Sequence, residues 1–358
     1  MGKYFFAFLI VLLTYSTSSF SQSRKDKKLA EKKRIEYEKQ RKKTVKDSLR
    51  AVKKARNGVP ENITVFPKNF LLKPKYVFPG IIFNVSNRDK SGESFNWKPS
   101  IPGVVGGALR IKKFYISMGF RLPGTAEHEK KFGKTTYQDY FINFQGRIVA
   151  WTIFYRDYRG FYLDDYKKFY PNWREDSLGF PKSKNLHIIE GGMNLGFNFN
   201  KNFSLNAAFA QSERQKKSAG SFLMTVSERY QRIETDSNIV PATQALNYSN
   251  LDRLTAGDFL TTIISLGAGY QFVMGKFHLT PVVLIGSGIQ IQNYQQPGRN
   301  LWRLNIPTYA NARAQFGYNG DNFFANIIYG AEFNSVPIKE SRVRLFYQVI
   351  EFGMGVRF

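Results

Sequence analysis

The chain has 358 residues, among them 53 Lys and Arg, 27 Asp and Glu, 33 Phe, 20 Tyr, 29 Gly and no Cys. The lack of Cys excludes disulfides, cysteine-bound zinc, iron–sulfur clusters and a lipid on an N-terminal cysteine, and a mean hydropathy of -0.37 excludes a bundle of apolar membrane helices. The formal charge of +26 is typical of proteins that bind nucleic acid, but the distribution of this charge along the chain favours other partners.

Residues 1–21 are predicted to form a secretory signal peptide. Lys3 gives the segment a positive start, and the uncharged apolar run Tyr4–Tyr15 follows. Ser19 and Ser21 then supply a small-x-small cleavage site before Gln22. The alternative is a membrane anchor, which is disfavoured because the apolar run is too short to cross about 30 Å of hydrocarbon. Nucleic acid is not an expected partner of an exported protein.

Residues 22–75 are predicted to form a basic periplasmic tail and linker. Within them, Ser23–Arg56 holds 16 Lys and Arg and 5 Asp and Glu, a net charge of +11, with no Gly and no Pro. Pairs such as Glu38 and Lys42 give some support to a helix. The composition is typical of a solvated segment that is partly helical or disordered. The alternative is an electrostatic clamp on an anionic surface.

Residues 76–358 alternate between apolar and polar side chains, most clearly in Trp302–Tyr318. Strict alternation indicates a strand with one apolar and one polar face. The apolar face carries aromatic residues at both ends and small aliphatic residues between them, as in strands that cross a bilayer. A soluble β-sandwich also alternates. Its strands usually have about 5–6 residues, however, and many of these segments are more than twice as long.

The chain ends in an alternating segment whose last residue is aromatic. Its apolar face consists of Phe352, Met354, Val356 and Phe358. This ending looks like the signal by which the barrel-assembly machinery recognises outer-membrane β-barrels. The last strand is expected to pair with the first, because an open sheet edge cannot be satisfied in lipid.

Thirteen candidate strands follow from the alternation. They are 77–86, 95–110, 112–122, 135–145, 147–160, 186–199, 203–212, 219–232, 259–273, 276–292, 302–318, 322–335 and 341–358. Bacterial barrels have an even number of strands, with short periplasmic turns and longer outer loops. One more strand around Ile239–Tyr248 makes fourteen and places the longer connections, 213–218 among them, outside. Without that strand and 77–86 there are twelve, and 161–185 becomes a long periplasmic loop.

The predicted fold is therefore all-β: a transmembrane, antiparallel, up-and-down β-barrel of fourteen strands, with twelve as the alternative. A short basic N-terminal tail, helical or disordered, precedes it. The expected location is the bacterial outer membrane, with the tail in the periplasm.

Three segments resemble blocks of an uncharacterised family of Bacteroidota outer-membrane proteins, domain of unknown function 4421. They are Asn200–Leu223 (NKNFSLNAAFAQSERQKKSAGSFL), Tyr158–Leu163 (YRGFYL) and Trp97–Gly107 (WKPSIPGVVGG), the last with Ser100 where the family usually has Asn. The resemblance covers most of the chain after about residue 75. It implies an outer-membrane barrel and brings no activity, substrate or catalytic residue.

The first of these segments contains a charged connection. Its residues are Glu213, Arg214, Lys216, Lys217 and Ser218, and Gly220 supplies backbone freedom for the return of the chain. The favoured interpretation is a charged hairpin in which Glu213 pairs with a cation of a neighbouring strand. The alternative is a binding site for lipopolysaccharide phosphates or for a partner.

No motif for catalysis or cofactor binding is found. The three histidines, His128, His187 and His278, share no short motif, so metal ligation is unsupported. The sequence has neither G-x-S-x-G nor a phosphate-binding loop. We therefore expect no catalytic residue, no metal and no cofactor. His278 faces the predicted lumen and is the candidate base if the barrel is a membrane-embedded hydrolase.

The polar faces of the strands predict which side chains line the lumen. The candidates are Lys113, Arg121, Asn143, Glu190, Asn194, His278, Arg303, Asn311, Arg313, Glu332, Glu351 and Arg357. Their mixed charges either pair across a plugged lumen or line a water-filled pore with a preference for anions.

The leading functional hypothesis is a non-enzymatic pore or transport channel for small solutes. The alternative is a structural or accessory subunit of a larger envelope complex, and a hydrolase is the lesser alternative. Expected partners are outer-membrane lipid and lipopolysaccharide, together with the assembly machinery during biogenesis; envelope protein partners are not identified by the sequence.

Overall fold

The structure is a computed structural model. It describes residues 24–56, 59–68, 70–87, 89, 92–236, 238–248, 251, 254–296, 299–338 and 341–358. The predicted signal peptide, residues 1–21, lies outside the described residues. The chain divides into two compact units, Met1–Gly58 and Val59–Phe358.

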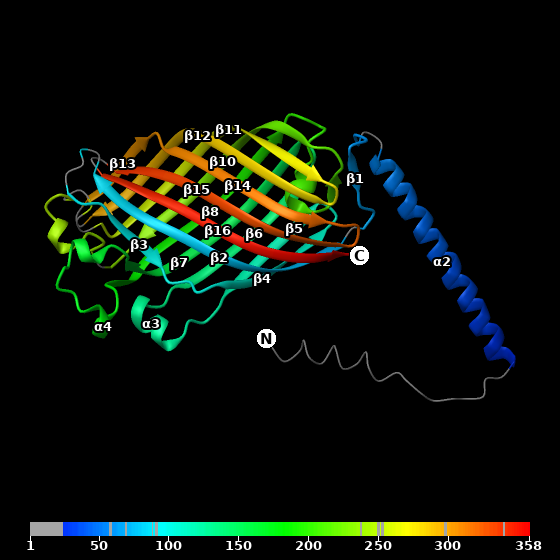
Figure 1. Cartoon of the computed structure of the whole chain (residues 1–358), viewed down its shortest axis with the longest axis horizontal. Helices are drawn as coiled ribbons and strands as arrows, with labels where there is room; N and C mark the ends of the chain where they lie inside the picture. Colours follow the sequence, from blue (N-terminus) through cyan, green and yellow to red (C-terminus); the bar gives the residue numbers. More distant parts are fainter. Residues whose placement is uncertain are drawn as a thin grey trace. The chain divides into compact units, whose positions relative to one another are not determined.

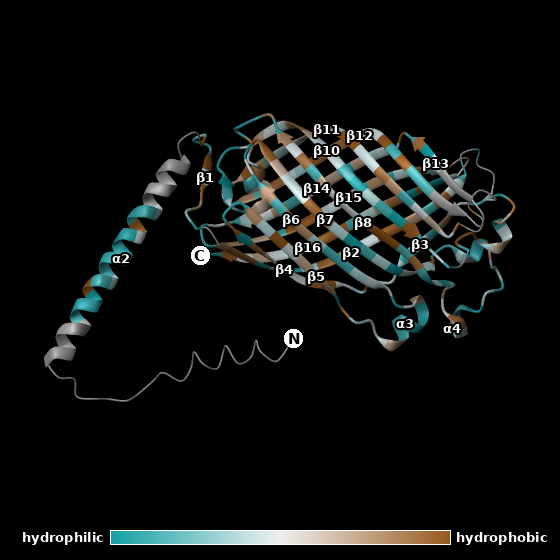
Figure 2. Cartoon of the chain, turned by 180° about the vertical axis from the view of Figure 1, so that it is seen from behind, coloured by the Kyte–Doolittle hydropathy of each residue, from teal (hydrophilic) through white to brown (hydrophobic). Residues whose placement is uncertain are grey.

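The first unit contains a single long helix, α2 (Arg24–Arg56). Lys, Arg, Glu and Ala dominate it, and these residues have high helix propensity. The side chains of residues 31–48 are all exposed, and most of the coloured part of α2 in Figure 2 is hydrophilic. The predicted basic tail is thus helical over this range. In the described part of the chain, no helix has the length and apolar character needed to span a membrane.

The second unit is a β-barrel (Figure 1). Its wall strands are β2 (Phe70–Asn87), β4 (Val104–Ile111), β5 (Phe114–Arg121), β6 (Thr136–Gln145), β7 (Val149–Leu163), β8 (Lys182–Asn198), β10 (Ala219–Glu234), β11 (Ala256–Met274), β12 (Phe277–Gln296), β14 (Thr308–Asn319), β15 (Phe323–Ile338) and β16 (Ser341–Arg357). Two shorter strands, β3 (Phe95–Pro99) and β13 (Arg299–Asn305), extend the same sheet, and β1 (Ile63–Val65) and β9 (Glu213–Gln215) form a separate pair. The helical segments are α3 (Ala126–Phe132), η1 (Tyr166–Lys168), α4 (Glu175–Leu178), the π-helical turn η2 (Asn206–Ala210) and η3 (Ala242–Gln244).

The twelve wall strands close into a ring. Each pairs antiparallel with its neighbour along the chain, β11 pairs with β12, and β16 pairs with β2. At one end, Phe70 and Phe358 exchange backbone hydrogen bonds of 3.2 and 3.1 Å. We call this the terminal end of the barrel and the opposite end the loop end. The expected pairing of the first and last strands is confirmed.

The sheet and the ring that closes the barrel have different numbers of strands, and these are the two numbers that the sequence predicted. Among the described residues the sheet has fourteen strands, and twelve of them form the ring. Segment 95–110 is split into β3 and β4, and 302–318 into β13 and β14 at Ile306 and Pro307. The first strand begins at Phe70, earlier than expected.

Two predicted strands were wrong. Segment 203–212 contains η2, and Ile239–Tyr248 contains η3. Segment 203–212 is buried inside the barrel and is not part of its wall. Without it the number of strands is already even, so no additional strand around Ile239–Tyr248 is needed. The connection 213–218 consequently lies at the terminal end, with the short turns, and not among the outer loops.

The outer surface of the barrel is apolar over a belt. On β16 the outward side chains from Ile350 to Phe358 are all apolar and 40–60% exposed. Outward residues of other strands repeat this, for example Ile327 at 45% and Leu266 at 46%. Along the strands in Figure 2, hydrophobic and hydrophilic residues alternate. Towards the loop end the outward positions become polar, as at Gln348 and, beyond Phe346, at Arg344 and Arg342.

The loop-end half of the lumen holds an apolar core. Inward residues of the wall strands, such as Phe83, Leu186 and Phe259, are fully buried there. Side chains of the connections pack against them, including Tyr248. Trp97 of β3 joins this core and donates a hydrogen bond from its ring nitrogen to the Ile239 carbonyl at 3.0 Å. The connections are thereby folded over and into the loop end.

Candidate functional site

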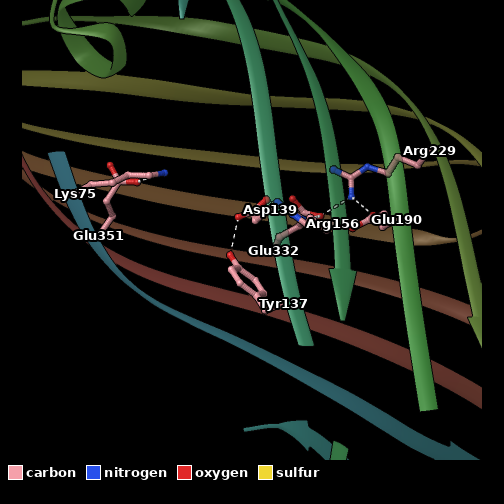
Figure 3. A network of polar contacts seen from close by, with 8 residues as sticks. All are labelled: Lys75, Tyr137, Asp139, Arg156, Glu190, Arg229, Glu332 and Glu351. Atoms are coloured by element: carbon pink, nitrogen blue, oxygen red, sulfur yellow. Dashed lines mark hydrogen bonds and ion pairs between the residues drawn. The ribbon is translucent and has the colours of Figure 1, made fainter. Parts of the chain in front are cut away.

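The middle of the lumen contains a network of ion pairs (Figure 3). Arg229 of β10 contacts Glu190 of β8 at 3.1 Å and Glu332 of β15 at 2.5 Å. Arg156 of β7 contacts the same two carboxylates at 3.2 and 3.7 Å. Because these strands lie on different parts of the wall, the network ties the barrel together across its interior. Asp139 of β6 adds a third carboxylate, 4.0 Å from Arg156.

Aromatic rings support the two arginines. The Arg156 guanidinium lies 4.8 Å from the ring of Tyr347, and that of Arg229 lies 4.8 Å from the ring of Tyr309. Both also contact Phe154, at 5.1 and 5.2 Å. Cation–π contacts of this kind are strongest where water is excluded. Each guanidinium group thus contacts both aromatic rings and carboxylates.

A second ionic group lies nearer the terminal end. Glu351 of β16 accepts from Lys73 at 2.5 Å and from Lys75 at 3.4 Å. The Lys73 side chain passes directly over Gly353, where an added Cβ would lie 2.0 Å from the Lys73 Cε. Glycine at this inward position therefore makes the contact between Lys73 and Glu351 sterically accessible.

A cavity of about 340 Å³ connects these two groups. Its lining includes charged residues of both, and Arg313 of β14 faces it as well. Polar amides complete the wall, with Asn143, Asn194 and Asn311 on three separate strands. The interior of this barrel is thus charged and polar at mid-height, although both of its ends are filled.

The terminal end is filled by the connection 199–218, which folds back into the barrel. Phe203 and Leu205 pack against inward residues of β10 and β12. Within η2 the small residues are buried, Ala207 and Ala208 completely. Phe209 lines the cavity, and its ring lies 4.3 Å from the Arg313 guanidinium. We call residues 203–212 the plug, since they form the floor of the cavity.

Several contacts fasten the plug. Arg357 donates to the Gln211 carbonyl at 2.7 Å, and Arg147 contacts the Glu213 carboxylate at 3.4 Å. Arg214 contacts Asp321, in the turn between β14 and β15, at 2.8 Å. The hydrogen bond from Arg214 lowers the pKa of Asp321 from its usual value, because it stabilises the charged carboxylate. β9, directly after the plug, pairs with β1 of the segment that precedes the barrel.

The predicted lumen residues have diverse positions. Six line the cavity: Asn143, Asn194, Asn311, Arg313, Glu332 and Glu351. Glu190 lies in the central network, His278 and Arg357 are buried near the terminal end, and Arg121 contacts Glu129 of α3 at 3.5 Å. Lys113 is exposed in the turn between β4 and β5, and Arg303 is exposed on β13, so neither of them lines the cavity.

The charged connection also differs from its prediction in part. Glu213 pairs with Arg147, which lies in the turn between β6 and β7 rather than on a neighbouring strand, and Glu213 is buried at the terminal end. Lys216 donates its backbone N–H to the Asn62 carbonyl at 2.7 Å, and the Ser218 hydroxyl accepts from the Val273 N–H at 3.0 Å. Gly220 lies within β10 against Tyr270, where an added Cβ would approach the ring to 2.6 Å. A side chain there would displace the ring, so close approach is the reason for glycine, rather than backbone freedom. Lys217 is exposed.

Five residues of the site were absent from the sequence prediction. They are Lys73, Lys75, Asp139, Arg156 and Arg229. The last three occupy inward positions of predicted strands, so the alternation alone could have identified them. Lys73 and Lys75 precede residue 77, where the first strand was expected to begin.

The histidines form no catalytic arrangement. The ring of buried His278 lies 3.4 Å from the side-chain nitrogen of Gln315, and no carboxylate of the described ranges is hydrogen-bonded to it. His187 lies on the outer surface between Asp157 and Glu234, at 2.8 and 2.9 Å. His128 contacts the Ser100 hydroxyl at 2.9 Å. The described residues contain no group of three or more His, Asp or Glu side chains that could hold a metal ion.

Comparison with known proteins identifies a family. Among solved structures, the outer membrane protease OmpT from Escherichia coli is 8% identical, with 83% of this chain and 99% of that chain covered and a TM-score of 0.35. The β-domain of the Bordetella autotransporter BrkA is 9% identical, with coverage of 78% and 98% and a TM-score of 0.33. No curated protein matches the chain. The family described as "Domain of unknown function (DUF4421)" matches residues 62–358. The chain therefore belongs to the DUF4421 family.

Proposed function

We propose that this protein is an integral outer-membrane β-barrel. The apolar belt supports the proposal. On β16 it extends over the nine residues from Ile350 to Phe358, and a tilted strand crosses a bilayer in about 9–11 residues. At ~3.4 Å per residue and a tilt of about 40°, this belt is roughly 20 Å tall, close to the ~25 Å of known outer-membrane barrels. In water, such a continuous apolar surface would cause aggregation.

The terminal end faces the periplasm in this proposal, and the loop end faces outward. The connections support this orientation. Turns 275–276 and 320–322 at the terminal end are short, whereas the connections that contain α3, α4 and η3 lie at the loop end. Short periplasmic turns and longer outer loops are the rule for bacterial barrels. The signal peptide predicted for residues 1–21 is consistent with this orientation.

Within the outer membrane, we propose that the protein is a sealed, non-enzymatic component of an envelope assembly rather than an open diffusion pore. The observation that carries this proposal is the filling of the lumen at two levels. The plug occupies the terminal end, and the apolar core around Phe83 and Phe259 occupies the loop end. Between them the ion pairs of Arg156 and Arg229 cross the interior.

Single-channel recording in planar lipid bilayers tests the sealed state. We expect the purified, folded barrel to show no sustained conductance. A porin of known conductance, reconstituted in the same bilayers, is the control for insertion and detection. Steady openings of wild-type protein in most insertion events would overturn the proposal.

A gated channel for small solutes is the second candidate, and the cavity favours it. A barrel with only a structural role has no need for an internal cavity of about 340 Å³ lined by charges. The plug that closes this space is linked through β9 to β1, so movement of the segment before the barrel can move the plug. Conductance that appears only when Arg214 and Asp321 are both neutralised, as R214Q and D321N, would favour this candidate.

A further inference from the structure

The part of the cavity next to the plug carries an excess of positive charge. Lys73 and Lys75 share the carboxylate of Glu351. Arg313 faces the same space, and within the described part of the chain no carboxylate lies at ion-pair distance from it. Its guanidinium rests on the Phe209 ring instead. Three cations thus face one carboxylate.

The carboxylates on the other side of the cavity compensate this charge only in part. Glu190 and Glu332 are held by Arg156 and Arg229 at 2.5–3.7 Å. Asp139 accepts from the Tyr137 hydroxyl at 2.9 Å. The three carboxylates of the central network exceed its two arginines by one, so they offset one of the two excess positive charges and leave the other unmatched.

Unmatched charge inside a protein is costly unless a counter-charge is present. The plug and the loop-end core fill the lumen on either side of this space. A negatively charged guest would supply the missing charge. We propose that the cavity binds a small anion with a phosphate or carboxylate group, held by Arg313, Lys73 and Lys75. This proposal goes beyond the sealed envelope role and does not depend on it.

The size and donors of the cavity fit this class of ligand. Its volume of about 340 Å³ lies at the lower end of the ~300–1,000 Å³ typical of small-molecule sites. A planar guanidinium can donate two parallel hydrogen bonds to an oxyanion, and lysine adds a mobile point charge. The side chain of Tyr115 lines the same region. Strands of the wall separate the site from lipid, which favours a free anion over a lipid headgroup.

Isothermal titration calorimetry of the folded barrel with inorganic phosphate, and separately with acetate, tests the proposal. We expect saturable binding of at least one of them to wild-type protein. Arg313→Gln should weaken it roughly tenfold or more, since a charged hydrogen-bonding group is lost. Arg303→Gln is the matched control, because exposed Arg303 lies outside the cavity. This variant should bind the anion with the affinity of wild-type protein.

Glu351→Gln gives a second variant with the opposite sign. It removes the carboxylate that pairs with Lys73 and Lys75, so the anion should bind more tightly. Heat-dependent migration in SDS gels checks that each variant is folded. To cover slow entry into a sealed barrel, the protein is also refolded with and without phosphate, and the unfolding temperatures are compared.

The outcomes separate clearly. Binding or stabilisation that is weakened by R313Q, strengthened by E351Q and unchanged by R303Q supports the site. Absence of both binding and stabilisation in wild-type protein, or an equal response in R313Q and wild type, overturns it. A conducting barrel with an intact anion response would contradict the sealed state and leave this proposal standing.

Discussion

The buried arginines are the residues on which the barrel interior depends most. Arg229 is 2% exposed and is the shared partner of Glu190 and Glu332. Replacing a buried ion pair as a whole is often tolerated, but removing one partner leaves a buried charge without compensation and costs about 3–5 kcal/mol. Arg156 also contacts both carboxylates. It therefore lowers, but does not remove, the energetic cost of leaving them without Arg229.

Arg229→Met should therefore lower the free energy of unfolding by about 3 kcal/mol or more. Denaturant titration of the folded barrel in detergent micelles measures this. When Glu332→Gln is combined with Arg229→Met, it should restore part of the lost free energy of unfolding, since it removes one unpaired charge. Arg303→Met, at an exposed position, should stay within about 0.5 kcal/mol of wild type. Equal effects of R229M and R303M would show that the network contributes nothing to stability.

At the residue scale, the sequence predicts inward positions but not partners. Alternation placed Glu190, Glu332 and Glu351 on the polar face. It could not pair Arg229 with Glu332, because the two residues are 103 positions apart in the sequence and meet only across the closed lumen. The exposed Arg303 occupies an inward position by alternation as well, but it lies beyond the filled part of the barrel. Burial depends on the height along the strand, which a period of two does not encode.

The plug is the element that sequence reasoning misread. Phe203, Leu205, Ala207 and Phe209 recur at a spacing of two, which mimics a strand with one apolar face. In the structure this segment is buried on all sides, so it needs no polar face, and its alanines suit a helical turn. A segment that fills a lumen and a segment that lines it can thus share one pattern.

Acidification should loosen the plug through Asp321. Its pKa is lowered in the folded state by the hydrogen bond from Arg214. A carboxyl group with a lowered folded pKa contributes stability above its unfolded pKa, and this contribution is lost as the pH falls through the folded value. We expect amide hydrogen exchange in residues 203–215, corrected for the intrinsic rate, to be faster below about pH 4 than at pH 7.

Asp321→Asn is the informative variant for this effect. It removes the titrating group, so exchange in the plug should already be faster at pH 7 and change little on acidification. Asp176→Asn, in the loop-end helix α4, is the control and should behave as wild type does. Equal pH responses of D321N and wild type would exclude Asp321 as the titrating group.

At the scale of the whole molecule, alternation and closure predicted the architecture well. Once 203–212 is removed, the twelve remaining predicted strands correspond to the twelve of the ring, with 95–110 and 302–318 each divided. Closure of β16 on β2 followed from the physical requirement that no edge is left unpaired. The division at Pro307 has a local cause, because proline cannot donate a ladder hydrogen bond. The filling of the lumen was not predictable, since it depends on connections whose side chains meet only after the barrel has closed.

A barrel that spans a membrane should respond to charge in a depth-dependent way. Ile327 of β15 points outward within the apolar belt, 45% exposed, whereas Gln348 of β16 points outward above it. Arginine on the lipid face costs about 2–4 kcal/mol at the bilayer midplane and only ~0–1 kcal/mol near its surface. We therefore expect Ile327→Arg to destabilise the barrel by several-fold more free energy than Gln348→Arg, measured by urea titration in lipid vesicles. On a water-facing surface both substitutions would change stability by about 0.5 kcal/mol or less, so similar small effects of the two variants would refute membrane embedding of this belt.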